Sequence, residues 1–203
     1  GPGGKLDKEI KELHQGHTFF ASCLKREIHP FMDLIAIFQI TGFLIKYKKR
    51  HPGTKVIVHT HCSKAGILGR LAAFLARSEI IVHTVHGYGY HLHPRRWLRP
   101  FFKFTERLCA QFTDAFSVDA QANKQQGAKE HLFSKAPVKV IYCGVNFDEF
   151  KGEVDPKIRE TLNITPENRV VIHITNFKEQ KNPNLFIEIA RRLCELNSEI
   201  RFI

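Results

Sequence analysis

Residues 55–91, KVIVHTHCSKAGILGRLAAFLARSEIIVHTVHGYGYH, decide the fold. Two apolar runs, 56–58 and 80–82, flank a segment rich in small residues, and each run leads into histidines and hydroxyl side chains. This alternation predicts a strand, a helix and a second strand, the βαβ unit of a parallel sheet. Ligands bind outside the carboxyl ends of such strands. We therefore expect the functional site where these two strands end.

Alternating apolar runs and amphipathic segments continue on both sides of this stretch. They predict helices at 5–14, 31–50, 120–132, 155–162 and 183–196 and strands at 18–22, 114–118, 138–142, 169–174 and 199–203. The pattern is typical of an α/β fold, here a Rossmann-like parallel sheet with flanking helices. Because the chain ends inside an apolar run, we expect this fold to be incomplete at both ends.

The composition of the segments also predicts a domain organisation. We expect a partial amino-terminal domain at 1–152, a linker at 153–168, and the first βαβ unit of a second domain at 169–203.

The net charge of +11 favours an anionic partner: a nucleotide, a phosphorylated lipid, a membrane surface or nucleic acid. No nucleic-acid reading motif is present, so we expect no specific nucleic-acid partner. The five cysteines never form a CxxC pair, which favours free thiols in a reducing compartment. No signal peptide is visible. The longest apolar candidate for a membrane span, 31–47, is short and contains Asp33, Gln39 and Lys46.

The loop after the first predicted strand contains His61, Ser63 and Lys64 and leads into a helix. Free backbone N–H groups at a helix amino terminus can hold an anion, and Lys64 would add a positive charge. The alternative is structural: Ser63 would cap the helix, and the small residues after it would allow close packing on the sheet.

The second strand is followed by His86, Gly87, Tyr88 and Gly89. Two glycines around a tyrosine allow a sharp turn and a close approach of the backbone to a ligand. A histidine at this place suits proton transfer or a hydrogen bond to a phosphate or hydroxyl. The alternative is a histidine that is hydrogen-bonded within the rim of the sheet.

Several side chains of this zone are able to bind a metal: His59, His61, Cys62, His83, His86, His91 and His93. Their spacing does not match a structural zinc motif, so we expect no metal. The basic and aromatic segment 93–103 has two interpretations. It either covers an acceptor cleft and touches an anionic membrane through Trp97 and Phe101, or it packs its aromatic rings on the domain.

The run VHTHCSKAGILGRLAAFLA followed by IVHTVHGYGYH resembles the amino-terminal domain of family 4 retaining glycosyltransferases. Residues 138–146, VKVIYCGVN, resemble that family's V-x-V-I-x-N-G-V-D strand and turn, with Phe150 as its following Phe. Residues 169–181 resemble the first strand and loop of the family's second domain, with Gln180 and Lys181 as its Q-K pair. The resemblance spans nearly the whole chain, in order.

This resemblance implies a GT-B enzyme that transfers a sugar from a nucleotide-sugar donor to an acceptor with retention and needs no metal or other cofactor. It implies that His86 is the catalytic-site histidine and that Lys181 binds the donor diphosphate. Asn176 stands where the family has the second diphosphate-binding residue, an Arg. Residues His61, Ser63, Lys64 and 87–89 would line the acceptor side of the cleft. Gly144 and Asn146 would form the hinge.

The expected partners are a nucleotide-sugar, a sugar or lipid-linked acceptor and an anionic membrane surface, in cell-surface polysaccharide or glycolipid synthesis. The expected location is the cytoplasm, peripheral on the inner face of the membrane. The family's first glycine-rich loop and its E-x7-E segment are not found in residues 1–203, so we expect this chain to be inactive alone. The alternative function is a non-catalytic Rossmann-like module that binds an anionic ligand.

Overall fold

The computed structural model describes residues 2, 4–13, 18–25, 27–92, 96–152, 155, 157–178 and 181–203. The chain divides into two compact units, Gly1–Cys143 and Gly144–Ile203, each described here by itself. The side chain of His91 and residues His93 and Gln180, named in the sequence predictions, lie outside the described part.

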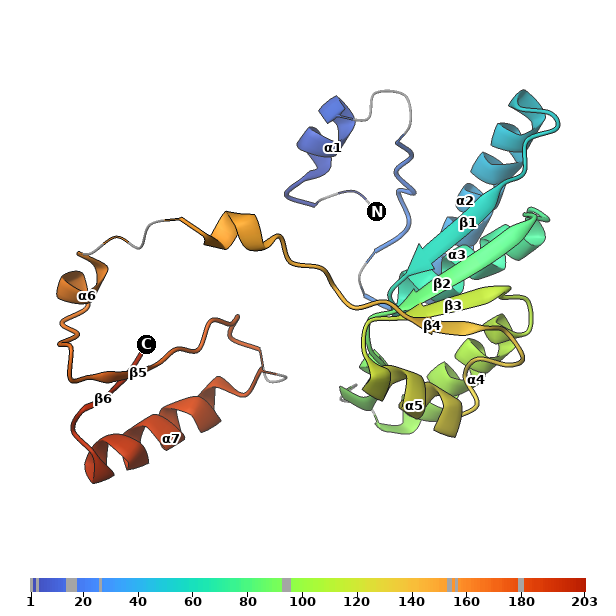
Figure 1. Ribbon diagram of the computed structural model, residues 1–203. Helices are drawn as coiled ribbons and strands as arrows, with labels where there is room; N and C mark the ends of the chain where they lie inside the picture. The colour runs from blue at the N-terminus through green and yellow to red at the C-terminus, as the bar shows by residue number, and fades with distance from the viewer. Residues whose placement is uncertain are drawn as a thin grey trace. The chain divides into compact units, whose positions relative to one another are not determined.

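The first unit is built on a parallel sheet of four strands (Figure 1). In chain order its elements are α1 (Asp7–Leu13), α2 (Pro30–Arg50), β1 (Ile57–His61), α3 (Ser63–Leu75), β2 (Ile80–Val85), η1 (Gly89–Leu92), η2 (Arg96–Leu98), α4 (Arg99–Ala110), β3 (Ala115–Val118), α5 (Gln121–Lys129) and β4 (Val138–Val140). The strand order is β1-β2-β3-β4, and all neighbouring strands are parallel. The predicted βαβ unit and the α/β fold class are therefore confirmed.

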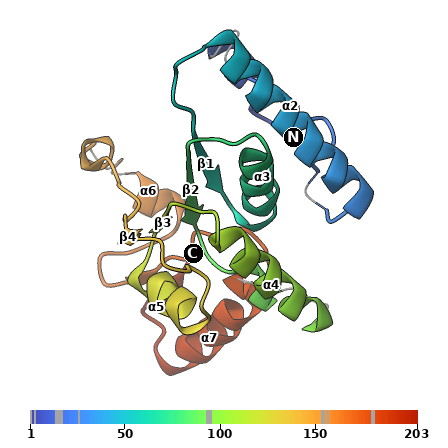
Figure 2. The same ribbon diagram turned by 90° about the vertical axis from the view of Figure 1, so that its right-hand side faces the viewer.

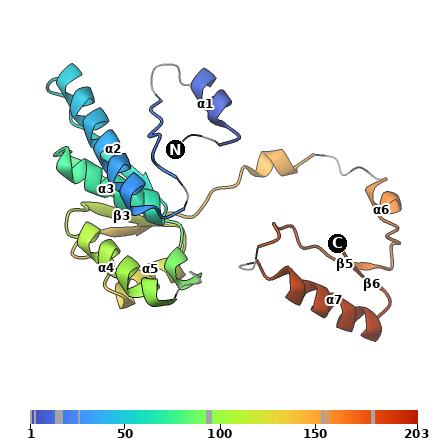
Figure 3. The same ribbon diagram turned by 180° about the vertical axis from the view of Figure 1, so that it is seen from behind.

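The strand order decides which face of the sheet the helices cover. Each crossover moves to the next strand in the same direction, so right-handed connections place α3, α4 and α5 on one face. Figures 1 and 3, seen from opposite sides, show the strands in front in the first view and the helices in front in the second. The covered face carries the buried residues of β2, Ile81, His83 and Val85, whereas Ile57 on the other face is exposed.

The hydrophobic core lies between this covered face and the helices behind it. Val85, Phe116 and Val118 from the strands pack against Ala110 of α4 and Phe133, which follows α5. The rings of Phe116 and Phe133 meet edge to face with centroids 5.1 Å apart. Burial of each such side chain contributes about 1.5–3 kcal/mol to folding. The carboxyl ends of β1, β2 and β3 are thereby held in one row.

The prediction of a strand at 18–22 is wrong, because this segment runs along α2 instead of pairing with a strand. The Phe19 ring stacks on Phe43 of α2 at 4.5 Å. Gln39 of α2 accepts from the backbone N–H of Cys23 at 3.3 Å and donates to Ser22 Oγ at 2.8 Å. Side-chain contacts with a helix thus take the place of a strand ladder.

Helix α2 is the one helix in the described part that is long and apolar enough to cross a membrane by length and composition. The sequence expectation had excluded this segment because of its polar residues. Two polar residues of α2 make hydrogen bonds within the same unit: Asp33 accepts from the backbone N–H of His29 at 3.1 Å, and Thr41 donates to the carbonyl of Ala72 at 3.4 Å. Length and hydropathy alone therefore do not show whether α2 crosses a membrane.

The second unit contains one βαβ unit. Its elements are η3 (Phe147–Phe150), α6 (Ile158–Thr161), β5 (Arg169–Val171), α7 (Pro183–Leu196) and β6 (Ile200–Phe202). Strands β5 and β6 pair in parallel, and α7 packs on them through Phe186, whose ring lies 5.5 Å from that of Phe202. Asn182 caps α7 by accepting from the N–H of Leu185 at 3.3 Å.

Gly127 of α5 provides a test of the packing that supports the second strand end. A Cβ added there would collide with the hydroxyl of Tyr88 and the ring of Phe133, whereas a Cβ on Gly42 of α2 would meet nothing within 4 Å. We expect Gly127→Ala to lower the free energy of unfolding by about 1–3 kcal/mol. Gly42→Ala should raise it by up to about 1 kcal/mol, because alanine favours helix interiors. Urea unfolding measures both, and equal effects would contradict the packing described here.

Candidate active site at the strand ends

Three neighbouring strand ends bring His61, His86 and Asp119 together. His61 is the last residue of β1, His86 follows β2, and Asp119 follows β3. The ring nitrogen His61 Nδ1 lies 3.2 Å from His86 Nε2, and His86 Nδ1 lies 3.5 Å from Asp119 Oδ2. The two imidazole rings are stacked with centroids 5.4 Å apart. The sheet therefore forms a row of two histidines and one carboxylate at its carboxyl edge.

The carboxylate at one end decides how the protons are arranged along this row. Asp119 is held by Asn123 Nδ2, which donates to its Oδ1 at 2.6 Å, so that Oδ2 faces His86. A carboxylate only accepts, which favours the tautomer of His86 with its proton on Nδ1. His86 Nε2 then accepts from His61 Nδ1, and the Nε2 lone pair of His61 is left at the end of the row.

His61 is kept neutral by its surroundings. Partial burial lowers its pKa, and the neighbouring imidazoles of His59 and His86 lower it further. His59 is anchored separately, since its Nε2 lies 2.7 Å from the hydroxyl of Thr84 on β2. At neutral pH the exposed end of the row is thus a hydrogen-bond or proton acceptor.

The turn between β1 and α3 is strained at the centre of the site. Cys62 has φ 63° and ψ 166°, a region that is almost restricted to glycine, and it makes no side-chain cap of α3. Ser63 is the first residue of α3, so the alternative in which it caps the helix is not supported. No acidic residue stands in the first turn of α3, and its N–H groups keep their positive potential.

The ammonium group of Lys64 is paired within the unit and does not face an open binding site. Its Nζ lies 2.6 Å from Asp33 Oδ1 and donates to the carbonyls of Lys25, at 2.9 Å, and Glu27. The side chain therefore ties the amino terminus of α3 to α2 and to the loop before it.

The predicted turn after β2 has the expected backbone. Gly87 has φ 137°, which side chains rarely adopt, and Gly89 begins η1. Tyr88 turns away from solvent, and its hydroxyl donates to the carbonyl of Asn123 at 3.1 Å. Burial raises the pKa of Tyr88, so it remains a neutral donor. Tyr88 and Asp119 thus both contact Asn123 of α5, which aligns the turn with the third strand end.

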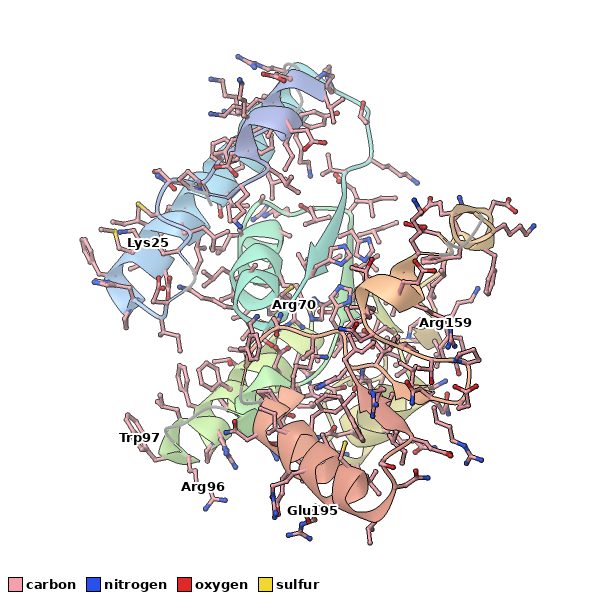
Figure 4. All side chains as sticks on the ribbon, turned by 90° about the vertical axis from the view of Figure 1, so that its left-hand side faces the viewer. Lys25, Arg70, Arg96, Trp97, Arg159 and Glu195 are labelled. Atoms are coloured by element: carbon pink, nitrogen blue, oxygen red, sulfur yellow. The ribbon has the colours of Figure 1, made fainter. Side chains whose placement is uncertain are left out.

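A buried ion pair lies between the helices that cover the sheet beneath the candidate site. Arg70 of α3 is fully buried and pairs with Glu106 of α4, and its Nε donates to the carbonyl of Gly66 at 3.1 Å. Figure 4 shows Arg70 between α3 and the sheet. His83 of β2 is also buried, and its Nδ1 lies 2.9 Å from the hydroxyl of Thr60. This polar layer fixes α3 and α4 against the strands that carry His61 and His86.

A cavity of about 180 Å³ lies beside the site. It is lined mainly by apolar side chains and reaches the site at Ser63 and Gly89; its lining is Ile28, Ser63, Lys64, Ile67, Gly89, Tyr90, Phe102 and Glu106. Its chemistry suits hydrocarbon better than phosphate.

The remaining predicted residues belong to the second unit. Lys181 and Asn176 are both exposed, on the loop between β5 and α7, where the N–H of Lys181 donates to the carbonyl of Lys178 at 2.8 Å. Gly144 begins the second unit. Asn146 caps η3 by accepting from the N–H of Asp148 at 3.2 Å. Within the described residues no three His, Cys, Asp or Glu side chains form a metal-binding group.

Sequence reasoning missed Asp119, the strained backbone of Cys62 and the pairing of Arg70 with Glu106. Asp119 had a usable signal, since it stands directly after a predicted strand, as His86 does. The strained Cys62 had none, because its residue type does not indicate a left-handed φ. The pair of Arg70 and Glu106 joins two helices 36 residues apart, which periodicity does not reveal.

The parallel sheet and the helices that flank it define an α/β protein of the Rossmann-like class, and the polar row lies at the carboxyl edge of the sheet, where proteins of this class bind ligands. Residues 6–149 match the model of glycosyltransferase family 4. The chain therefore belongs to glycosyltransferase family 4, as the sequence resemblance predicted.

One curated relative is the UDP-Gal:alpha-D-GlcNAc-diphosphoundecaprenol alpha-1,3-galactosyltransferase of Escherichia coli. The chain is 32% identical to it over 185 residues, which cover 89% of this chain and 46% of that enzyme. The chain thus spans about half the length of this curated relative.

Two solved structures share the fold. HepE of Anabaena, crystallised with UDP and glucose, matches with a TM-score of 0.60 and 19% identity, over 96% of this chain and 49% of HepE. Sucrose-phosphate synthase of Thermosynechococcus elongatus matches with a TM-score of 0.55 and 14% identity, over 87% of this chain and 51% of that protein. These matches confirm the predicted fold of the GT-B type.

Proposed function

We propose that this chain supplies the acceptor side of a retaining glycosyltransferase that moves a sugar from a nucleotide-sugar to a lipid-linked or sugar acceptor. The observation that carries the proposal is the row of His61, His86 and Asp119 at three adjacent strand ends, in a chain of family 4. The named activity of the Escherichia coli relative, transfer of galactose to a diphosphoundecaprenol-linked sugar, supports this class of reaction.

In the proposed reaction a hydroxyl of the acceptor takes the place of His61 Nδ1 at His86 Nε2 and donates a hydrogen bond to that nitrogen. Asp119 keeps the proton of His86 on Nδ1, and His61, with its lowered pKa, accepts a hydrogen bond. The uncapped amino terminus of α3 favours negative charge next to this row. Ser63, Lys64 and residues 87–89 are proposed to line the acceptor side.

The second unit is proposed to meet the donor. Lys181 would bind the leaving diphosphate by its positive charge, with Asn176 on the same loop as a polar partner. The proposed organisation is an acceptor domain at 1–152, a linker at 153–168 with the hinge at Gly144 and Asn146 before it, and the start of a donor domain at 169–203. No metal is required in this mechanism, because the charges that stabilise the diphosphate come from side chains and helix amino termini.

A lipid-linked acceptor is supported by the apolar cavity beside Ser63 and Gly89, which offers space to hydrocarbon next to the polar row. The proposed place of action is the cytoplasmic face of a membrane, where an anionic surface attracts a chain of net charge +11. Synthesis of a cell-surface polysaccharide or glycolipid is the corresponding process.

Calorimetry with UDP-galactose and with a polyprenyl diphosphate mimic tests the proposal. We expect His86→Ala to weaken binding of a mimic that carries a sugar by up to about tenfold, because the hydrogen bond between a sugar hydroxyl and His86 is lost and such a neutral hydrogen bond is worth about 0.5–1.5 kcal/mol. Lys181→Ala should weaken binding of UDP-galactose by a similar factor. The matched controls are His51→Ala, an exposed histidine at the end of α2, and Lys178→Ala, an exposed lysine on the same loop as Lys181.

Two outcomes would contradict the proposal. Equal losses in the control variants, together with a steep fall of affinity with salt, would favour the alternative of a general anion-binding module. Absence of any binding by the unsubstituted chain would also reject a substrate site within it. Sugar transfer by this chain itself, followed by mass spectrometry of the acceptor, is expected to be absent.

A further inference from the structure

Two ring nitrogens at the candidate site lie as close together as two ligands of one metal ion. His61 Nδ1 and His86 Nε2 are 3.2 Å apart. Two imidazole nitrogens that bind one zinc ion at about 2.0–2.1 Å in a tetrahedral arrangement are roughly 3.3 Å apart. The backbone positions are set by β1 and β2, which pair in parallel and lie side by side in Figure 2. Both side chains are exposed, so their rings have room to turn toward an ion without a change of the backbone.

The far side of the His86 ring is held as the ring of a metal-binding histidine usually is. His86 Nδ1 lies 3.5 Å from Asp119 Oδ2, and Asn123 Nδ2 donates to the other oxygen of that carboxylate at 2.6 Å. Histidine ligands commonly place their second ring N–H against a carboxylate, which fixes the tautomer and raises the basicity of the nitrogen that binds the metal. The lone pair of His86 is therefore kept on Nε2, the nitrogen that faces His61.

The ring of His61 is able to serve as the second ligand at neutral pH. Partial burial and the imidazoles of His59 and His86 lower the pKa of His61, so the ring is neutral and carries a lone pair. In the free protein its proton is on Nδ1, where it is donated to His86 Nε2. When an ion binds Nδ1, that proton moves to Nε2 by exchange with water. Both rings are neutral before and after, so no net proton is released.

The other imidazoles near this pair have partners of their own. His59 Nε2 lies 2.7 Å from the hydroxyl of Thr84, and Nδ1 of the buried His83 lies 2.9 Å from the hydroxyl of Thr60. Among the residues that the structure describes, no third His, Cys, Asp or Glu side chain completes a metal-binding group. A bound ion would therefore keep its remaining positions open to water. Such an open site differs from the closed structural zinc site that the sequence spacing excludes.

We infer that His61 and His86 form an open, two-imidazole binding site for Zn²⁺. Imidazole nitrogens suit Zn²⁺ and the similar ion Co²⁺, whereas Mg²⁺ and Ca²⁺ require oxygen ligands. The ion would occupy His86 Nε2, the nitrogen at which the acceptor hydroxyl is proposed to bind, so Zn²⁺ would compete with the acceptor and inhibit sugar transfer. Only this competition rests on the proposed function, because binding of the ion needs neither donor nor acceptor.

Calorimetry with Zn²⁺ and absorption spectroscopy with Co²⁺ test the site in the whole chain, without donor or acceptor. We expect both ions to bind and Mg²⁺ to give no heat of binding. The chain also has exposed thiols, among them Cys62 next to the pair, which could bind the same ions. A thiolate ligand gives bound Co²⁺ a strong near-ultraviolet charge-transfer band. The proposed site, with nitrogen and water ligands, should show the visible bands of Co²⁺ without this feature.

Variants then identify the ligands. His61→Ala and His86→Ala should each weaken Zn²⁺ binding by about tenfold or more, because the two rings no longer hold the same ion at a high effective concentration. Asp119→Asn keeps both rings and should still weaken binding by about tenfold, since the carboxylate orients His86 and raises its basicity. The matched controls are His59→Ala, beside the pair, and His51→Ala, at the end of α2, which should bind Zn²⁺ as the unsubstituted chain does. Circular dichroism checks that each variant is folded.

Three results would overturn the inference. The first is failure of the unsubstituted chain to bind Zn²⁺. The second is binding that is weakened as much in the two control variants as in His61→Ala and His86→Ala. The third is a thiolate band of Co²⁺ that disappears in Cys62→Ser, which would assign the ion to the cysteine. The metal site and the proposed function fail separately, because a chain that binds Zn²⁺ but not the sugar-bearing mimic would contradict only the proposed function.

Discussion

Replacing Glu106 with alanine is expected to lower the free energy of unfolding of the first unit by about 3–5 kcal/mol. Glu106 is the partner of Arg70, a guanidinium that is completely buried beneath the site. Its removal leaves a positive charge in the protein interior, and the remaining contact of Arg70 Nε with the Gly66 carbonyl does not neutralise it. Urea unfolding followed by far-ultraviolet circular dichroism measures this loss.

Two further variants separate a buried charge from simple loss of volume. Arg70→Met combined with Glu106→Leu removes both charges and keeps most of the volume, so it should be less destabilising than Glu106→Ala. Glu12→Ala removes one partner of an exposed pair, Lys8 and Glu12, in the same unit, and should cause no measurable change. A double variant that is as unstable as the single one would contradict the assignment of the loss to an unpaired charge.

The stability of the first unit is expected to fall when the pH is lowered from about 6.5 to about 3. His83 is only 2% exposed, and burial lowers its pKa from 6.5 to about 3, with Arg70 adding to the effect. The unfolded chain therefore binds a proton in this range that the folded chain does not. The free energy of unfolding should decrease by about 1.4 kcal/mol for each pH unit, and be fully retained above pH 6.5.

The groups that face His83 allow its contribution to be separated from others. A hydrogen bond with the backbone of Thr60 raises the pKa of His83, whereas the charges of Arg70, His61 and His59 lower it. Glu79, whose pKa is lowered to about 2 chiefly by its hydrogen bond with Lys48, loses its contribution only at lower pH, between 4.5 and about 2.

Unfolding measured in urea from pH 7 to pH 4 tests this dependence. His83→Gln should remove most of the slope between pH 6.5 and 4, whereas the exposed His51→Gln should leave it unchanged. An unchanged slope in His83→Gln would show that other groups cause the acid sensitivity.

The amino-acid sequence by itself determined the class of fold and pointed to the strand ends that form the candidate site. In residues 55–91, two apolar runs of β-branched residues flank a segment with helical periodicity. This local pattern correctly predicts the strands β1 and β2 and the helix α3. The rule that parallel strands bind ligands at their carboxyl ends then pointed to His61 and His86, which the structure brings within hydrogen-bond distance. The motifs also pointed to family 4, which the match over residues 6–149 shows.

The sequence failed where a contact joins distant segments or where geometry contradicts residue type. The apolar segment 18–22 has the composition of a strand, but its partner is the surface of α2. The sequence predicted that Lys64 would add a positive charge to an anion site, but its ammonium group forms an ion pair with Asp33. The basic and aromatic segment 93–103 was recognised, but its continuation to Phe104 and Leu108 on one side of α4 required the helix and its exposure.

Only the tertiary structure decided how the chemical groups are combined. Asp119 acquires its role because β3 lies next to β2 in register, so that its carboxylate faces His86. Arg70, Glu106 and His83 become a buried layer because α3 and α4 cover the same face of the sheet. The periodicity of apolar residues predicts local secondary structure. Charge pairing and burial depend on which distant segments pack against each other, and local periodicity does not reveal this.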